Sequence, residues 1–178
     1  LHVTVQQSKR EVARILRDNA TLLQAQIEDL LRFNAAAFEA RQLSRRKTEL
    51  VALVNELVHQ QRLQWQARQL SVQVHGRPLW VEVDPDKLGA ALGNLLSNAI
   101  RFSPPGSTIR WSVSSLPGRA CLDIMDAGPG IAAPDRARVF EPFYRGERQP
   151  PDAPRGSGIG LSIVQEYITA HGGQIELM

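Results

Sequence analysis

At its centre the chain reads Asp84-Pro-Asp-Lys-Leu-Gly-Ala-Ala-Leu-Gly-Asn-Leu-Leu-Ser-Asn-Ala-Ile-Arg-Phe102. Asp84 can accept hydrogen bonds from the free N–H groups of a helix start, and Pro85 suits the first helical position. Apolar residues then recur at intervals of three and four, which predicts a helix with one buried face. These residues are Leu88, Ala91, Leu92, Leu95, Leu96 and Ala99.

The other side of this helix carries Asn94, Asn98 and Arg101, spaced four and then three residues apart, so their side chains converge. Two neutral oxygen ligands beside a fixed positive charge suit a hydrated Mg²⁺ and the phosphates that it carries. The same pattern also fits a capped amphipathic helix whose Asn and Arg side chains are merely solvated. This helix alone leaves both interpretations open.

Length and composition narrow the class of protein. The 178 residues can hold one domain with a core and an appended element, and 43% hydrophobic and 22% charged residues are ordinary for a globular protein. The net charge is +3, but the basic residues are scattered among acidic ones, so we expect no nucleic-acid partner. No apolar run reaches the length of a membrane span. The single Cys121 cannot form an internal disulfide, which agrees with a reducing compartment.

The N-terminal part of the chain predicts a long helix that runs to about Ala40, because apolar residues keep helical spacing without an interrupting glycine or proline. These residues are Val12, Ile15, Leu16, Leu22, Leu23, Ile27, Leu30 and Leu31. Asn19 lies in the same seam, where a polar residue can fix the register of packed helices. The stripe must be buried in a bundle or dimer, or else against the rest of this chain. The polar stretch 42–48 favours the bundle or dimer.

The remaining segments alternate between helical and strand patterns. They predict a helix over 49–69, short strands over 70–74 and 79–83 joined by a turn, a hairpin over 108–114 and 120–125, a short helix over 134–139, a polar loop over 147–155, a helix from 161 to the glycine pair 172–173, and the start of a strand over 174–178. This order predicts the α+β class, with a two-layer sandwich in which helices cover one face of a mixed sheet.

Two glycine-rich loops carry the candidate chemistry. Asp126 ends a predicted strand before Gly128 and Gly130, so its carboxylate could accept from the amine of adenine at the floor of an apolar pocket. An ordinary Asp-Gly turn explains the same residues. The second loop contains Gly156, Gly158 and Gly160, and glycine-rich loops before a helix present N–H groups to phosphate.

That second loop matches neither the P-loop nor the dinucleotide pattern, since Leu161 stands where the third glycine of the latter belongs. Arg145 follows two phenylalanines and could reach into the same site. An ordinary surface arginine would explain it equally well.

Together these motifs resemble the GHKL ATPases, in the form that sensor histidine kinases carry. Asn94-Leu-Leu-Ser-Asn98-Ala with Arg101-Phe102 is similar to the N box, and Asp126-Ala-Gly-Pro-Gly to the G1 box. Phe140-Glu-Pro-Phe-Tyr-Arg resembles the F box, which separates histidine kinases from gyrase, Hsp90 and MutL relatives, and Gly156-Ser-Gly-Ile-Gly-Leu161 resembles the G2 box. The resemblance implies the GHKL, or Bergerat, ATP-binding fold, with ATP and Mg²⁺ as ligands.

The resemblance also divides the chain and assigns roles. Residues 47–178 would form a C-terminally incomplete catalytic ATP-binding domain, and 1–46 part of the second helix of the dimerisation and histidine-phosphotransfer domain. Asn94 and Asn98 would hold Mg²⁺, and Asp126 would receive the adenine amine. The implied catalytic residues are Asn94, Arg101 and Arg145. The implied ATP-binding residues are Asn94, Asn98, Arg101, Phe102, Asp126, Gly128, Gly130, Ile131, Arg145, Gly156, Gly158, Gly160 and Leu161.

The chain departs from the family at the phosphoacceptor. None of His2, His59, His75 and His171 is followed by the Glu or Asp that an acceptor histidine usually has next to it. We therefore expect the acceptor to lie before Leu1, so that this fragment binds ATP without phosphorylating itself. The partners implied are a second copy, through the N-terminal helix, and a response regulator, in the cytoplasmic portion of an inner-membrane sensor.

Two other functions stay open. One is a nucleotide-regulated dimerisation or docking module without kinase activity. The other is an ATPase of the gyrase or MutL kind. Those ATPases place a water-activating Glu one helical turn before the metal-binding Asn, where this chain has Asn94, which favours transfer to histidine over hydrolysis.

Overall fold

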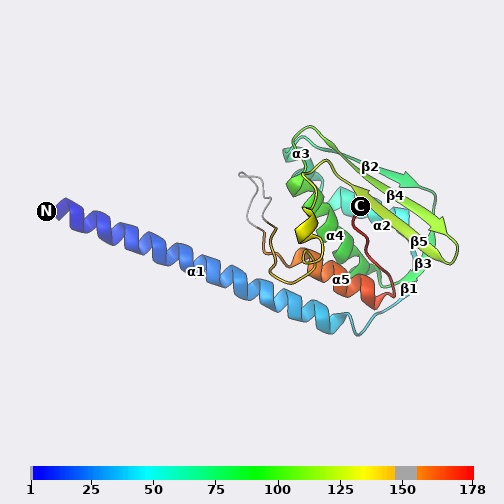
Figure 1. The fold of residues 1–178 in the computed structure, drawn as a ribbon, viewed down its shortest axis with the longest axis horizontal. Helices are drawn as coiled ribbons and strands as arrows, with labels where there is room; N and C mark the ends of the chain where they lie inside the picture. The colour runs from blue at the N-terminus through cyan, green and yellow to red at the C-terminus, as the bar shows by residue number, and fades with distance from the viewer. Residues whose placement is uncertain (1, 147–155) are drawn as a thin grey trace.

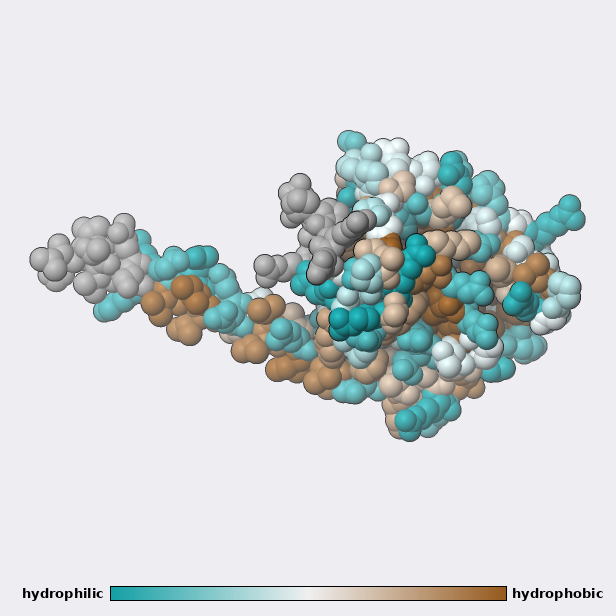
Figure 2. All heavy atoms as spheres, in the orientation of Figure 1, coloured by the Kyte–Doolittle hydropathy of each residue, from teal (hydrophilic) through white to brown (hydrophobic). Residues whose placement is uncertain are grey.

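The computed structural model describes residues 2–146 and 156–178. Helix α1 (His2–Glu39) is a rod that projects from the domain formed by the rest of the chain (Figure 1), which confirms the predicted long helix. Ala36, near its end, is 3% exposed, whereas Leu23 and Leu31 are 58% and 62% exposed. Figure 2 shows a brown, hydrophobic stripe along the projecting length of α1. Most of the stripe therefore has no partner within the described residues.

The strands form two small sheets. In the first, β2 (Ser71–Gly76) pairs parallel with β4 (Thr108–Leu116), which pairs antiparallel with β5 (Arg119–Met125). In the second, β1 (Arg46–Glu49) pairs antiparallel with β3 (Trp80–Val83). The predicted hairpin and the predicted mixed sheet are confirmed.

Helices cover one face of the three-stranded sheet (Figure 1). They are α2 (Leu50–Gln60), α3 (Arg62–Ala67), α4 (Pro85–Phe102) and α5 (Gly160–Ala170). Leu96 of α4 packs with Leu50 of α2 and with Ile109 and Trp111 of β4, and all four are at most 1% exposed. Burial of each such side chain stabilises the fold by about 1.5–3 kcal/mol, so this packing holds α4 against the sheet.

The end of α1 is fastened to the domain by a second apolar cluster and by polar contacts. Ala36 packs with Ala91 of α4 and with Ile163 and Tyr167 of α5. Glu39 accepts hydrogen bonds from Lys87 Nζ at 2.6 Å and from the Tyr167 hydroxyl at 3.0 Å. The last turns of the long helix thus pack on this chain itself, while the stripe further upstream stays exposed.

Several local predictions differ from the structure because they depend on distant partners. Residues 46–48 belong to the predicted polar stretch and Glu49 to the predicted helix over 49–69. Together they form β1, since β3 supplies their ladder hydrogen bonds. The strands predicted over 70–74 and 79–83 follow one another but join different sheets. The helix predicted over 49–69 is interrupted at Gln61, where α2 ends and α3 begins.

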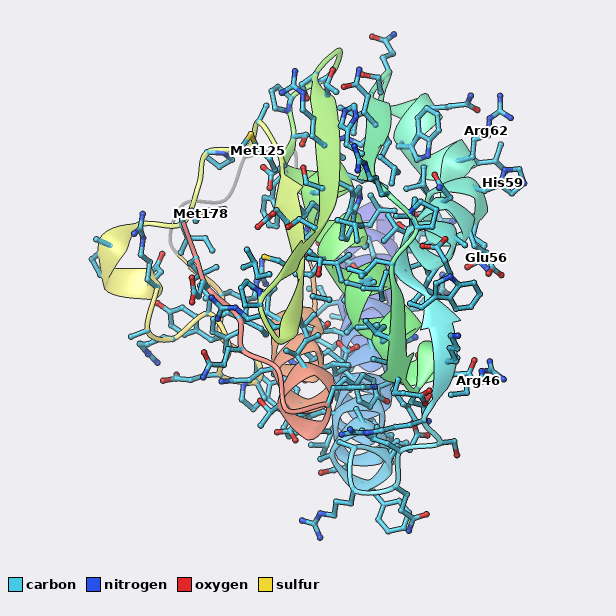
Figure 3. All side chains as sticks on the ribbon, turned by 90° about the vertical axis from the view of Figure 1, so that its right-hand side faces the viewer. Arg46, Glu56, His59, Arg62, Met125 and Met178 are labelled. Carbon is cyan, nitrogen blue, oxygen red and sulfur yellow. The ribbon has the colours of Figure 1, made fainter. Side chains whose placement is uncertain are left out.

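Two predictions near the C-terminus also need correction. The short helix predicted over 134–139 is a single 3₁₀ turn, η1 (Ala133–Asp135). The segment 174–178 is predicted to start a strand, but it forms no ladder with the described residues. It runs on the β5 side of the sheet, where Met178 lies near Met125 in the view of Figure 3. The loop predicted over 147–155 lies outside the described residues.

Candidate functional site

The start of α4 is fixed by Asp84, which is 3% exposed. Its carboxylate accepts hydrogen bonds from Asp86 N and Lys87 N, both at 3.1 Å, and from Ser44 N at 2.8 Å. Burial alone would raise the pKa of Asp84, but these three N–H donors and the Lys87 ammonium outweigh it, and the pKa falls below its ordinary value. The predicted cap is confirmed, and it also ties the segment after α1 to the central helix.

Asn94 lies on the side of α4 that faces the start of α5. A Cβ added to Gly160 would lie 3.9 Å from Cβ, Cγ and Oδ1 of Asn94, so the glycine-rich turn and this amide are neighbours. Asn98, one turn further along α4, is half-buried, as is Leu161 in the first turn of α5. The structure therefore brings the second glycine loop to the polar side of α4.

Arg101, near the end of α4, lies close to the second glycine loop and to Arg145 of the F-box segment. A Cβ on Gly156 would collide with the Arg101 guanidinium, which therefore lies directly against the glycine. Arg101 Nε is buried and has no hydrogen-bond partner within the described residues. Burial, and then the positive charge of Arg145, lower the pKa of Arg101. Two guanidinium groups close enough to affect each other make a site suited to a polyanion.

Phe102 meets the loop that follows β5. A Cβ on Gly128 would lie 3.3 Å from both Cβ and O of Phe102. The Asp126 carboxylate is exposed and accepts a hydrogen bond from Gly128 N at 2.6 Å. Gly130 has a φ of +68°, the left-handed region that glycine tolerates, and Ile131 is half-buried beyond it. This loop thus packs against Phe102 at the end of α4.

The F-box segment is joined to the second glycine loop by backbone contacts. Phe143 N donates to Gly158 O at 3.0 Å, and a Cβ on Gly158 would lie 2.9 Å from Tyr144 O. Phe143 has a φ of +65° and Gly158 a φ of +78°. A phenylalanine held in the left-handed region is uncommon and is typical of a functional turn.

An open cleft of about 740 Å³ runs beside this assembly. Arg101, Phe102 and Gly128 line it, together with Arg68 and Ser103, which lie outside the sequence motifs. Arg68 donates from a terminal nitrogen to Ser103 O at 3.0 Å and so holds the end of α4. The exposed Asp126 is not part of the cleft lining.

The predicted residues thus gather in two groups along one side of α4. Asn94 and Arg101 meet the second glycine loop, with the charge of Arg145 close enough to affect Arg101. Phe102 meets the loop of Asp126 and Gly128. Among the described residues no cluster of His, Cys, Asp or Glu could hold a metal ion by itself. Two amide oxygens near a polyanion site fit a hydrated cation that arrives with phosphates.

Comparisons with known proteins identify the family of the chain. The model of the family "Histidine kinase-, DNA gyrase B-, and HSP90-like ATPase" matches residues 83–178. The sensor histidine kinase TmoS of Ectopseudomonas mendocina is 34% identical over 92% of this chain and 17% of its own length. The sensor histidine kinase GlrK of Escherichia coli K12 is 31% identical over 96% of this chain and 36% of its own length. The chain therefore spans well under half of these relatives.

Solved structures of histidine kinases are also similar to this chain. The mycobacterial sensor histidine kinase MprB matches with a TM-score of 0.62 and 32% identity, over 72% of this chain and 80% of that one. Full-length ShkA in complex with AMPPNP matches with a TM-score of 0.72 and 25% identity, over 94% of this chain and 36% of that one.

The chain belongs to the histidine kinase-, DNA gyrase B- and HSP90-like ATPase family, because the family model covers more than half of it. Within that family it carries the ATP-binding catalytic domain of the sensor histidine kinases of two-component signalling. In the part of the chain that the structure describes, no helix combines the length and apolar character needed to cross a membrane.

Proposed function

We propose that this chain binds ATP with Mg²⁺ along the polar side of α4 and donates the γ-phosphoryl group to a histidine outside this sequence. The observation that carries the proposal is the setting of Arg101: half-buried, unpartnered at Nε within the described residues, lying against Gly156, and within the electrostatic reach of Arg145. A triphosphate would neutralise both guanidinium groups and satisfy the buried nitrogen.

Each group along α4 has a role in this proposal. Arg101 and Arg145 hold the phosphates and offset the negative charge that spreads over the transferred group, which is the main demand of phosphoryl transfer. Asn94 and Asn98 contribute amide oxygens to Mg²⁺, which would link the phosphates to α4. Asp126 receives the adenine amine through its exposed carboxylate, with Phe102 beside the base. The similar protein ShkA was solved in complex with AMPPNP, which supports the binding of an adenine nucleotide by this chain.

We further propose that residues 1–46 and 47–178 are separate functional parts, a dimerising helix and a catalytic domain. The exposed stripe of α1 would pair with a second copy, as in a helical bundle. The whole protein would then pass its phosphoryl group to a response regulator. Segments outside this chain would anchor it at the cytoplasmic face of a membrane.

The kinase proposal is tested by restoring the upstream segment of the natural protein. We expect an acid-labile phosphohistidine on a residue that precedes Leu1 after incubation with ATP and Mg²⁺. His59 lies on the exposed side of α2, across the domain from the loop that follows Met125 (Figure 3), so it should stay unlabelled. Labelling of His59 would contradict the proposal.

The alternative is a nucleotide-regulated docking module without kinase activity, which the exposed α1 stripe favours. Nucleotide binding without phosphohistidine in the extended protein would select this alternative.

A further inference from the structure

Asp135, which belongs to none of the predicted motifs, is a buried carboxylate beside the F-box segment. It is 7% exposed and lies in η1. Its Oδ1 accepts a hydrogen bond from the Tyr144 hydroxyl at 2.7 Å. A buried carboxylate is costly unless it is paired or hydrogen-bonded, so its position calls for an explanation.

The second oxygen of Asp135 lies against Gly146. A Cβ added to Gly146 would be 2.5 Å from Asp135 Oδ2, which leaves no room for a side chain at that position. Asp135 therefore contacts the residue before Arg145 and the residue after it. The Tyr144 ring is held on another side by the Arg138 guanidinium, which lies 4.2 Å from the ring centroid.

The same short segment is fixed from the opposite direction by the second glycine loop. Phe143 N donates to Gly158 O at 3.0 Å, and a Cβ on Gly158 would lie 2.9 Å from Tyr144 O. With Phe143 in the left-handed region, the backbone around Arg145 is held in an unfavourable conformation that its surroundings must enforce.

The contacts of Asp135 and of Gly158 with this segment fix the position of Arg145 relative to Arg101. Arg145 is close enough to Arg101 for its charge to lower the pKa of Arg101, after the larger effect of burial. The two guanidinium groups repel each other, so contacts of the backbone next to Arg145 must hold it near Arg101.

We infer that Asp135 is a positioning residue for the terminal phosphate of ATP: its two oxygens hold Tyr144 and Gly146, and thereby aim Arg145 at the site beside Arg101. The inference rests on the proposed function and deepens it. Arg145 distinguishes a triphosphate from a diphosphate, and the Tyr144–Asp135 hydrogen bond makes that distinction possible.

The test compares the affinities of AMPPNP and ADP, each with Mg²⁺, by titration calorimetry. Tyr144→Phe removes one hydroxyl and leaves the ring in place. We expect it to weaken AMPPNP about fivefold to tenfold while ADP changes less than about twofold. Arg145→Ala should show the same selective loss. The double variant should be no worse than Arg145→Ala, because both changes act on the same contact.

Two further variants separate positioning from stability. Asp135→Asn keeps an oxygen acceptor for Tyr144 and should retain most of the preference for AMPPNP, whereas Asp135→Ala should lose it. Tyr167→Phe is the matched control, since it also removes a hydroxyl bonded to a carboxylate, that of Glu39, but at the α1–α5 contact. It should leave the AMPPNP to ADP ratio unchanged.

An equal loss of both nucleotides in Tyr144→Phe, or no loss, would overturn the inference and leave the proposed function standing. If the unaltered chain binds neither nucleotide, the proposed function fails and the inference fails with it.

Discussion

The guanidinium of Arg101 occupies the space in which a side chain on Gly156 would begin. These residues are far apart in the sequence, yet their contact brings the second glycine loop to the end of the central helix. The glycine is required here for space, because any Cβ would force the arginine out of its position.

The first prediction concerns this contact. Gly156→Ala should displace Arg101 and weaken the binding of ATP·Mg²⁺ about tenfold, or about 1.4 kcal/mol, as measured by titration calorimetry. Gly93→Ala is the control, since a Cβ there lies 3.6 Å from Gln61 Nε2, an ordinary contact. That control should bind normally and be slightly more stable, because alanine favours a helix. Equal affinity for Gly156→Ala and the unaltered chain would contradict the proposed role of Arg101.

The second prediction concerns the cap of α4. Asp84→Ala leaves the N–H groups of Ser44, Asp86 and Lys87 without their acceptor, so it should lower the free energy of unfolding by about 2 kcal/mol in urea denaturation. Asp86→Ala, at an exposed position of the same turn, should cost much less.

Acid should reproduce this effect. The folded-state pKa of Asp84 is depressed, so its stabilising contribution is complete above the ordinary pKa, near 4, and is lost as the pH falls through the lower folded-state value. Unfolding measured between pH 5 and about pH 2 should therefore show a steeper loss in the unaltered chain than in Asp84→Asn. Parallel curves would count against this assignment.

The third prediction concerns the contact between α1 and α5. Burial, and then the hydrogen bond to Glu39, raise the pKa of Tyr167 to about 12. The neutral phenol is thus favoured in the folded state, and its contribution is present below pH 10 and lost as the pH rises toward 12. Tyr167→Phe should be less stable than the unaltered chain by about 1 kcal/mol at neutral pH. That difference should shrink or reverse near pH 12; a constant difference would contradict the assignment.

The fourth prediction concerns the exposed stripe of α1. Ile27→Glu and Leu31→Glu place a charge at positions that are 58% and 62% exposed in one chain but would be buried in a dimer. Light scattering after size exclusion should give a dimer for the unaltered chain and a monomer for each variant. Glu28→Lys, at an exposed position on the polar side of α1, should remain dimeric. A monomer in all four would refute dimerisation through α1.

The sequence predicted those parts of the fold that depend on local patterns. The cap at Asp84, the length of α4 and the face shared by Asn94 and Arg101 follow from spacing within one helix, and the structure has all of them. The hairpin of β4 and β5 is likewise local. By contrast, the pairing of β1 with β3 joins residues more than thirty positions apart, and nothing within 46–49 specifies its partner.

The site shows the same division. The contacts of Gly128 with Phe102 and of Gly156 with Arg101 could be expected only from the resemblance to a family, since no periodicity links those residues. Asp135 and Tyr144 are nine positions apart in irregular backbone, so neither helical nor strand spacing marks their hydrogen bond. Arg68 and Ser103 are 35 positions apart, and no sequence pattern predicts their hydrogen bond.

The central claim is that one continuous nucleotide site runs along α4 from Asn94 to the loop of Asp126. Calorimetric titration of ATP·Mg²⁺ into the unaltered chain, Asp126→Asn and the control Asp123→Asn tests it most directly. We expect saturable binding to the unaltered chain and to Asp123→Asn, and binding at least tenfold weaker to Asp126→Asn, with an unchanged melting temperature in the absence of nucleotide. Equal affinity in all three, or no binding to the unaltered chain at millimolar ATP, would contradict the account.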